Sequence, residues 1–136
     1  MRSRSRWLPV AAAFFATAVP TVAASAPEHG FPYGSELRMD ARPIAGSKRV
    51  PLLEVESDGA AALDLWCDSV QSRFVVAGDT VTIILGPRTQ RACTSAQTQA
   101  DGELLAALEA VTLWRREGDG VVLVGPRELR FMPSTN

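Results

Sequence analysis

The sequence predicts a small, mainly β (or α+β) domain, namely a curled antiparallel sheet or small barrel of about seven or eight strands. One α-helix is expected to pack on the sheet, and one disulfide is expected to staple it. Three observations lead to this fold class: short alternating or apolar stretches separated by turns, one segment with helical periodicity, and two cysteines. The chain has 136 residues, which suits one domain.

The start of the chain has the layout of a secretory signal peptide. Three arginines lie within the first six residues, an uncharged apolar run follows over residues 7–22, and small residues come next. This run contains two prolines and is shorter than the roughly 20 apolar residues that a membrane span needs. We therefore expect residues 1–24 to be a signal peptide, cleaved after Ala24 or alternatively after Ala26. The mature protein would be periplasmic or secreted, with no membrane span.

The charge of the mature protein excludes one class of partner. The whole chain has a net charge of −1, and loss of the three arginines before residue 24 brings it to −4. The sequence contains no basic stripe of the kind that binds nucleic acid. We expect neither nucleic acid nor an anionic membrane surface to be its partner.

The two cysteines are expected to form a disulfide. In an oxidising compartment, an even number of cysteines in a small domain favours a bridge, here Cys67–Cys93. The bridge would enclose about 25 residues and stabilise the fold by about 3–4 kcal/mol on the chain-entropy treatment. A redox-active thiol pair is the alternative, but the two cysteines lack the Cys-x-x-Cys spacing that lowers a thiol pKa.

The first half of the domain is predicted to contain short strands. Residues 25–35 show no periodicity and are expected to form a tail or strap, so the domain itself spans residues 36–136. Residues 36–40 alternate, with Leu37 and Met39 on one face, as in a half-buried strand. Further strands are predicted at residues 52–55, 60–67, 71–76 and 80–85, the last two joined by a turn at residues 77–79.

Gly86 and Pro87 are expected to end the strand at 80–85, because proline cannot donate to a ladder of hydrogen bonds.

A helix is predicted next from an apolar stripe of helical period, made of Ala100, Leu104, Leu105, Leu108 and Val111. Thr94 or Ser95 is the expected cap. Since a helix with one apolar stripe must lie against another layer, we expect it to pack on the sheet.

Three final strands are predicted at residues 113–116, 121–124 and 128–132, separated by glycine-containing turns. With these, the chain resembles the META domain, also called HslJ-like, over about residues 37–131. The resemblance lies in a strand ending in cysteine, a Gly-Asp hairpin, the leucine-rich helix segment ELLAALEAVTLW and the segment VVLVGPRELRF. The usual Gly-Cys-Asn and Thr-Arg-Met-Ala-Cys motifs of the family read here Trp66-Cys67-Asp68 and Thr89-Gln90-Arg91-Ala92-Cys93. The resemblance implies a curled antiparallel barrel with one helix in a bacterial envelope protein, linked to envelope stress and drug tolerance.

The chain offers few groups for catalysis or metal binding. Its one histidine, His29, lies in the tail, where a Ser-His-Asp arrangement would be badly positioned. Two cysteines and scattered carboxylates match no metal-ligand spacing. Asp64 and Asp68 flank Cys67, and we interpret them as solvated or turn residues rather than an acid–base pair. We expect a protein that is not an enzyme and that has no cofactor and no metal.

Two tryptophans are candidates for an interaction surface. Trp66 and Trp114 have opposite parity to their neighbouring leucines, so they point outward or toward the helix. Arg91, Arg115 and Arg116 are close to them in sequence, and exposed Trp and Arg are typical of interaction hot spots. The alternative is that both tryptophans are buried between sheet and helix.

Three hypotheses for function follow. The first is an exported, monomeric binding or interaction module for an envelope protein or a small ligand, linked to envelope stress or maintenance. The second is a lysozyme-inhibitor-like inhibitor of a cell-wall hydrolase, acting through the loop Ala41–Val50 with Lys48 and Arg49 at its end. The third is a barrel that holds a small apolar ligand, which requires an interior cavity. A domain this short is expected to fill its interior with side chains instead.

Overall fold

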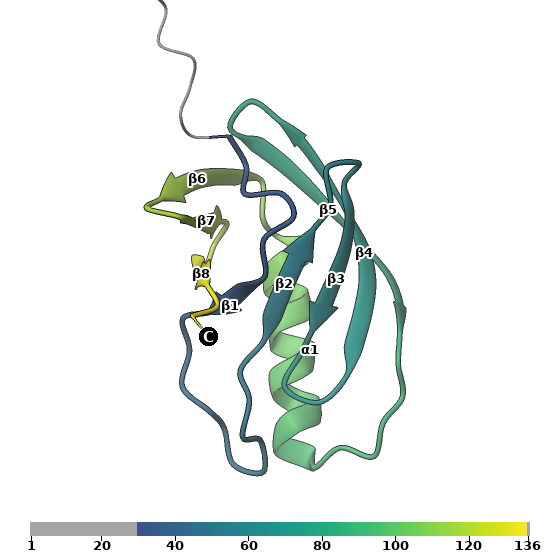
Figure 1. Cartoon of the computed structure of the whole chain (residues 1–136). Helices are drawn as coiled ribbons and strands as arrows, with labels where there is room; N and C mark the ends of the chain where they lie inside the picture. The colour runs from purple at the N-terminus through teal and green to yellow at the C-terminus, as the bar shows by residue number, and fades with distance from the viewer. Residues whose placement is uncertain (1–29, 136) are drawn as a thin grey trace, which may run out of the picture.

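The computed structural model describes residues 30–135, so the predicted signal peptide and residues 25–29 of the predicted tail, His29 included, lie outside the described residues. The described chain forms eight strands and one helix (Figure 1). They are β1 (Leu37–Met39), β2 (Leu52–Val55), β3 (Ala60–Asp64), β4 (Ser69–Ala77), β5 (Thr80–Arg88), α1 (Ser95–Glu109), β6 (Leu113–Glu117), β7 (Gly120–Val124) and β8 (Leu129–Pro133). Each strand pairs antiparallel with the next, and β1 pairs with β8, which closes a barrel. The predicted fold class is confirmed.

Alternation along the strands fills the barrel with side chains. On β1, for example, Leu37 and Met39 are buried and Arg38 between them is exposed, because successive side chains point to opposite faces. The strands contribute Leu37, Met39, Leu53, Val55, Ala61, Leu63, Val70, Phe74, Val81, Ile83, Val121, Leu123, Leu129 and Phe131 to one buried cluster. The interior is therefore a packed core, which does not favour a bound apolar ligand.

Helix α1 completes the barrel between β5 and β6. These two strands pair through Thr80 and Leu113 at one end, and α1 packs along β5 in between. Figure 1 shows α1 running lengthwise behind β2 and β3. Leu104 and Leu108 are buried and join the barrel core, so the predicted packing of the helix on the sheet is confirmed. No helix among residues 30–135 is long and apolar enough to cross a membrane.

The start of α1 is capped as the sequence predicts. Thr94 is the N-cap, and its side chain accepts a hydrogen bond from the Gln97 backbone N–H. The Gln97 side chain accepts from the Thr94 backbone N–H in return, which completes a capping box. Two of the N–H groups that a helix start leaves free are thus satisfied.

The predicted end of the strand at residues 60–67 is wrong. β3 ends at Asp64 rather than at Cys67, because the backbone after it turns away from the sheet. The Leu65 N–H donates to the Asp68 carbonyl at 2.8 Å, which closes a loop. Trp66 and Cys67 therefore lie in this loop between β3 and β4, and strand parity does not set the direction of their side chains.

The predicted end of β5 is also wrong, since the strand continues through Gly86 and Pro87 to Arg88. The pairing of β4 with β5 shifts register between Val70 and Ser72. Proline is tolerated at such irregularities because no ladder hydrogen bond is needed there. Glycine is required at position 86, where an added Cβ would lie 2.5 Å from the Gln71 carbonyl oxygen.

The described part of the predicted tail packs on one end of the barrel. The Phe31 ring lies 6.1 Å from the ring of Phe74 and 5.2 Å from that of Trp114, measured between centroids. Phe31 is buried as a result. Arg116 donates to the Gly30 carbonyl at 2.9 Å and fastens the same segment.

Candidate functional site

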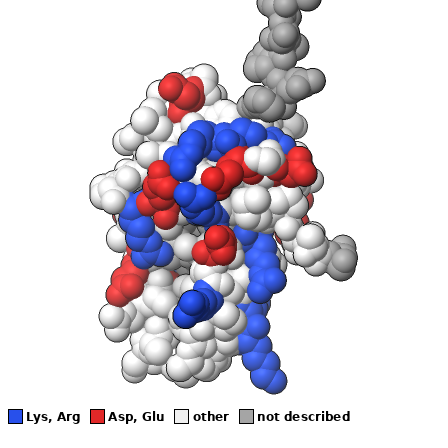
Figure 2. Space-filling view, turned by 90° about the vertical axis from the view of Figure 1, so that its left-hand side faces the viewer, with Lys and Arg blue, Asp and Glu red and all other residues white. Residues whose placement is uncertain are grey.

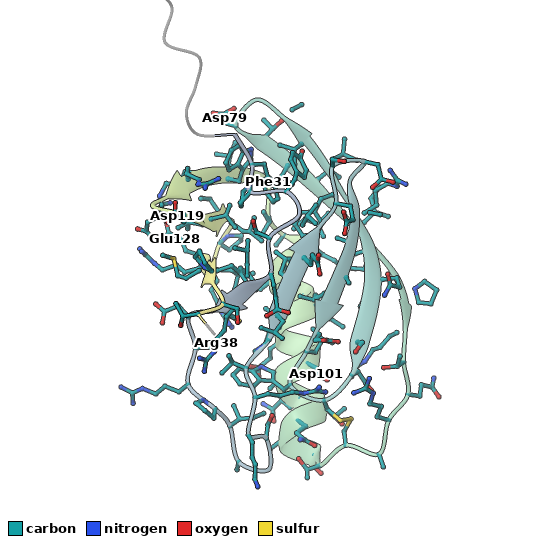
Figure 3. The ribbon with its side chains drawn as sticks, viewed as in Figure 1. Phe31, Arg38, Asp79, Asp101, Asp119 and Glu128 are labelled. Carbon is teal, nitrogen blue, oxygen red and sulfur yellow. A yellow bond between two sulfur atoms is a disulfide. The ribbon has the colours of Figure 1, made fainter. Side chains whose placement is uncertain are left out.

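A buried carboxylate on α1 organises the loop that carries Cys67. Asp101 is 0 % exposed and lies at the lower end of the molecule in Figure 3. Its Oδ1 accepts hydrogen bonds from the backbone N–H groups of Trp66 at 2.8 Å and Cys67 at 3.3 Å. Its Oδ2 accepts from the Asp68 N–H at 2.9 Å. A buried N–H without a partner is costly, so this one side chain stabilises three consecutive peptide groups.

A second carboxylate, Asp68, joins the loop to the segment before α1. It is 4 % exposed and accepts from Arg88 Nε at 2.8 Å, from the Arg91 backbone N–H at 2.9 Å and from the Thr89 hydroxyl at 3.4 Å. Burial by itself raises the pKa of this carboxyl. The hydrogen bonds from Arg91, Arg88 and Thr89, with the charge of Arg88, outweigh burial and hold the pKa of Asp68 below its ordinary value.

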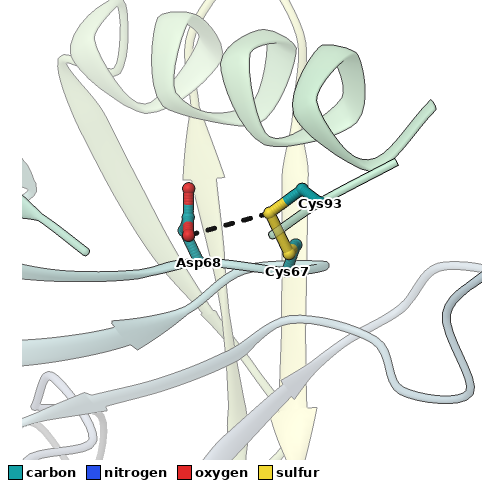
Figure 4. Close-up of side chains that lie close together, drawn as sticks. All are labelled: Cys67, Asp68 and Cys93. Atoms are coloured by element: carbon teal, nitrogen blue, oxygen red, sulfur yellow. Dashed lines mark hydrogen bonds between the residues drawn. A yellow bond between two sulfur atoms is a disulfide. The ribbon is translucent and has the colours of Figure 1, made fainter. Parts of the chain in front are cut away.

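The predicted disulfide is confirmed. Cys67 and Cys93 are bridged, with their Cα atoms 6.0 Å apart. Asp68 Oδ1 lies 3.8 Å from Cys93 Sγ, the approach drawn in Figure 4. A bridged sulfur carries no hydrogen, so we regard this as a contact and not as a donated hydrogen bond. Because metal binding by cysteine requires a thiolate, the group of Cys67, Asp68 and Cys93 is not a metal site while the bridge is intact.

A shallow groove of about 390 Å³ lies beside the disulfide. We call it the basic groove, and it is lined by Gly46, Ser47, Lys48, Arg49, Trp66, Cys67, Arg91, Ala92 and Gln97. Three of these nine residues are cations and none is a carboxylate. Hydrogen bonds hold its walls together: Gln97 Nε2 donates to the Gly46 carbonyl at 3.0 Å, and Ser47 Oγ donates to the Trp66 carbonyl at 3.1 Å.

Two arginines of the basic groove meet at one oxygen atom. Arg49 Nη2 donates to the Cys67 carbonyl at 3.0 Å, and Arg91 Nη1 donates to the same oxygen at 3.4 Å. Lys48 is exposed beside them. Among residues 30–135, none of these three cations lies within ion-pair distance of a carboxylate. The groove therefore concentrates positive charge in a protein whose net charge is negative.

Comparison with known proteins identifies the family. The family model for the META domain matches residues 35–135, which is most of the chain. The chain belongs to the META domain family. The match does not reach the narrower HslJ-like assignment, which stays a prediction. No curated protein matches this META domain.

One solved structure is similar to this META domain in fold. It is the crystal structure of a DUF4847 family protein from Bacteroides vulgatus ATCC 8482, with a TM-score of 0.50 and 13% sequence identity. The similarity covers 63% of this chain and 60% of that chain, so the two proteins share a part of their lengths. At this identity the similarity shows a common fold and nothing more.

The META domain places the residues of the predicted interaction surface at two ends of the barrel. Trp66 is 7 % exposed, so the buried alternative holds for it, and it lies with Arg91 on the basic groove. The backbone N–H of Trp66 donates a hydrogen bond to Asp101. The backbone N–H of Trp114 donates to the Asp79 carbonyl at 2.9 Å. Figure 3 shows Asp101 and Asp79 at opposite ends of the molecule, so the two tryptophans do not share a surface.

The other members of the predicted surface lie on β6 and already form hydrogen bonds or an ion pair within the domain. Trp114 is half-buried, and its Nε1 donates to the Gly78 carbonyl at 2.8 Å. Arg116 donates to the carbonyls of Gly118 and Gly30. Arg115 forms an ion pair with Glu128 at 2.8 Å. The structure therefore leaves no joint cluster of the five predicted residues.

The face formed by β6, β7 and β8 in the META domain carries alternating charges, as Figure 2 shows. Arg115 pairs with Glu128, and Arg130 pairs with Glu117 at 2.7 Å and with Glu128 at 3.5 Å. The hydrogen bond between Arg115 and Glu128 raises the pKa of Arg115 and lowers the pKa of Glu128. Because its charges neutralise one another, this face is a weaker candidate for a binding site than the basic groove.

Sequence reasoning missed Asp101 and the basic groove of the META domain. Asp101 precedes Leu104 by three residues and Leu108 by seven, which places it on the apolar stripe of α1. A carboxylate on the buried face of a helix is a signal that could have been used. The groove gave no such signal, because its residues come from four separate segments of the chain.

Proposed function

We propose that this META domain is an exported, non-enzymatic, monomeric binding module of the cell envelope and that its binding site is the basic groove. The single observation that carries this proposal is that Lys48, Arg49 and Arg91 lie in one concave surface and form no ion pair within residues 30–135. Export is supported by the signal-like start of the sequence and by the disulfide, which is typical of oxidising compartments. A role in envelope stress or maintenance follows from the family resemblance.

The state of the nearby carboxylates supports a binding role over catalysis. Asp101 uses both oxygens to hold backbone N–H groups. Asp68 accepts hydrogen bonds from three residues, and its lowered pKa keeps it ionised at neutral pH. A general acid or base needs a pKa near the working pH and access to substrate. The lowered pKa of Asp68 does not meet the first requirement, and the full burial of Asp101 does not meet the second.

The test compares three baits in an envelope extract: the native protein, a groove variant and a control variant. The groove variant carries Lys48→Gln, Arg49→Gln and Arg91→Gln. The control variant carries Arg38→Gln, Arg73→Gln and Arg127→Gln, which removes the same charge from exposed residues outside the basic groove. We expect an envelope component to be retained by the native and control baits and lost by the groove variant. Identical capture by all three baits would exclude the groove as the binding site.

A second candidate function is inhibition of a cell-wall hydrolase. The observation in its favour is that residues 46–49 of the predicted inhibitory loop line the basic groove, with Lys48 and Arg49 exposed. Glycoside hydrolases act through a pair of carboxylates, which a basic loop complements electrostatically. A lysozyme assay tests it, with residues 41–50 replaced by glycine and serine. Absence of inhibition by the native protein, or full inhibition by the replaced loop, would exclude this function.

A further inference from the structure

We propose that the ligand of the basic groove presents an anionic phosphoryl group. This inference rests on the proposed binding function and names the chemistry that the groove recognises. Its basis is the position of Arg49 and Arg91, whose guanidinium groups both donate to the carbonyl oxygen of Cys67. A carbonyl group is neutral, so it positions the two cations without compensating either charge.

Two like charges held this close repel one another, and the attraction of both to a bound anion offsets this repulsion. The two carboxylates behind the groove do not supply that anion. Asp68 is committed to Arg88 and to the Arg91 backbone N–H. Asp101 accepts from the backbone of the Cys67 loop, and its Oδ2 lies 3.8 Å from Arg88 Nη2. The positive charge of the groove is therefore available to a ligand.

The donors that remain favour a phosphoryl group over a single carboxylate. A guanidinium has five N–H groups, and Arg49 uses one of them and Arg91 two in hydrogen bonds within the described residues. Both can still form bidentate contacts, and Lys48 adds a third cation. A carboxylate has two oxygens and satisfies one guanidinium fork. A phosphoryl group has more oxygens and up to two negative charges, so it can engage all three cations.

The helix start beside the groove adds to the same preference. Gln97, in the first turn of α1, lines the groove, and this first turn contains no acidic residue. The partial positive charge of the helix N-terminus is thus not offset by its own side chains. The net negative charge of the protein opposes adsorption to a flat anionic membrane, which favours a compact phosphorylated ligand.

Titration calorimetry with inorganic pyrophosphate tests the inference on the purified, disulfide-bonded protein. We expect the native protein and the control variant to bind pyrophosphate. The groove variant should bind at least about 100-fold more weakly, since each hydrogen bond to a charged group contributes about a tenfold effect or more. Equal affinity of the native protein and the groove variant, or no binding by the native protein, would overturn the inference.

A second variant guards against misfolding, because Arg49 and Arg91 also hold the Cys67 loop. Lys48→Glu reverses the charge of an exposed side chain on the groove rim. It should weaken pyrophosphate binding by about tenfold or more without a change in the unfolding transition. Unchanged binding by a folded Lys48→Glu protein would count against the groove as the anion site.

Further arms identify the source of the phosphoryl group. Succinate is the carboxylate control, and succinate binding as tight as pyrophosphate binding would overturn the preference for phosphate. Vesicles of phosphatidylglycerol, compared with phosphatidylcholine, test a lipid headgroup, and groove-dependent vesicle binding would support the inference with a lipid source.

The two proposals fail in different ways. If pyrophosphate does not bind while an envelope component is captured through the groove, the inference falls and the proposed function stands. If pyrophosphate binds through the groove and no envelope component is captured, the inference stands, and the ligand of the groove is a small phosphorylated molecule rather than an envelope protein.

Discussion

Asp68 belongs to the loop at residues 65–68, Asp101 contacts this loop from α1, and the two carboxylates perform different tasks. Asp101 is buried on α1 and accepts from backbone N–H groups, whereas Asp68 accepts from an arginine side chain and from the next segment of the chain. The sequence pattern could place Asp101 on the buried stripe of α1, yet it could not show what the carboxylate holds. Its partners are more than 30 residues away, and no local pattern encodes such a pairing.

Asp68 makes stability depend on pH. Its pKa is lower in the folded protein than in the unfolded chain, so its contribution is fully present above the unfolded value of about 4 and is lost as the pH falls through the folded pKa. We expect Asp68→Asn to lower the free energy of unfolding by about 1–3 kcal/mol at pH 7. The difference from the native protein should shrink below about pH 4. Urea denaturation at a series of pH values measures it.

The exposed Asp119→Asn serves as the matched control for this experiment. It removes the same charge from a turn between β6 and β7. A pH profile of Asp68→Asn that parallels the native profile down to acid pH would show that the carboxylate contributes nothing.

Among the elements, α1 has a sequence that contains an internal conflict. Its cap and apolar stripe favour a helix, while Gly102 at its middle does not. The predicted strand ends at Cys67 and Leu85 are wrong because tertiary contacts override the local signals. Local parity and Pro87 suggested where the strands stop, but a loop held by Asp101 and a register shift opposite β4 decide where they do. Element type was predictable from periodicity, and element ends required tertiary contacts.

Gly102→Ala should stabilise the protein. The residue is exposed, and an added Cβ would have no atom within 4 Å, so the change carries no steric cost. Glycine in a helix interior costs about 0.5–1 kcal/mol relative to alanine, and we expect a gain of this size in the free energy of unfolding. Thermal and urea denaturation measure it.

Gly125→Ala provides the contrasting control, because its added Cβ would lie 2.8 Å from the Ala110 carbonyl oxygen. It should destabilise the protein. If both substitutions changed stability in the same direction, the packing at one of the two glycines would differ from that described.

At the scale of the whole molecule, the chain closes on itself twice. Strand β1 pairs with β8, and the disulfide joins the loop after β3 to the segment before α1. A curled sheet or barrel could be predicted from the number of strands and the turns between them. Closure between β1 and β8 could not, since Leu37 and Pro133 are far apart in the sequence and no local signal pairs them.

Replacement of both cysteines by serine should weaken the molecule without unfolding it. We expect Cys67→Ser with Cys93→Ser to lower the free energy of unfolding by about 2–4 kcal/mol. The barrel should persist, because the bonds from Asp101 to the Cys67 loop do not need the bridge. Far-ultraviolet circular dichroism and urea denaturation test this expectation, with the reduced native protein as control. A double variant that is unfolded in buffer would show that the bridge, and not Asp101, holds the loop.

The three bonds from Asp101 also bear on how the bridge forms. Synthesis proceeds from the N-terminus, so Cys67 emerges before Cys93, and both emerge before α1 is complete. In the folded protein Asp101 fixes the Cys67 loop, and this loop holds Cys67 beside Cys93. With two cysteines there is one possible intramolecular pairing. Formation of the bridge therefore requires an oxidant, but it does not require an isomerase to correct wrong intramolecular bridges.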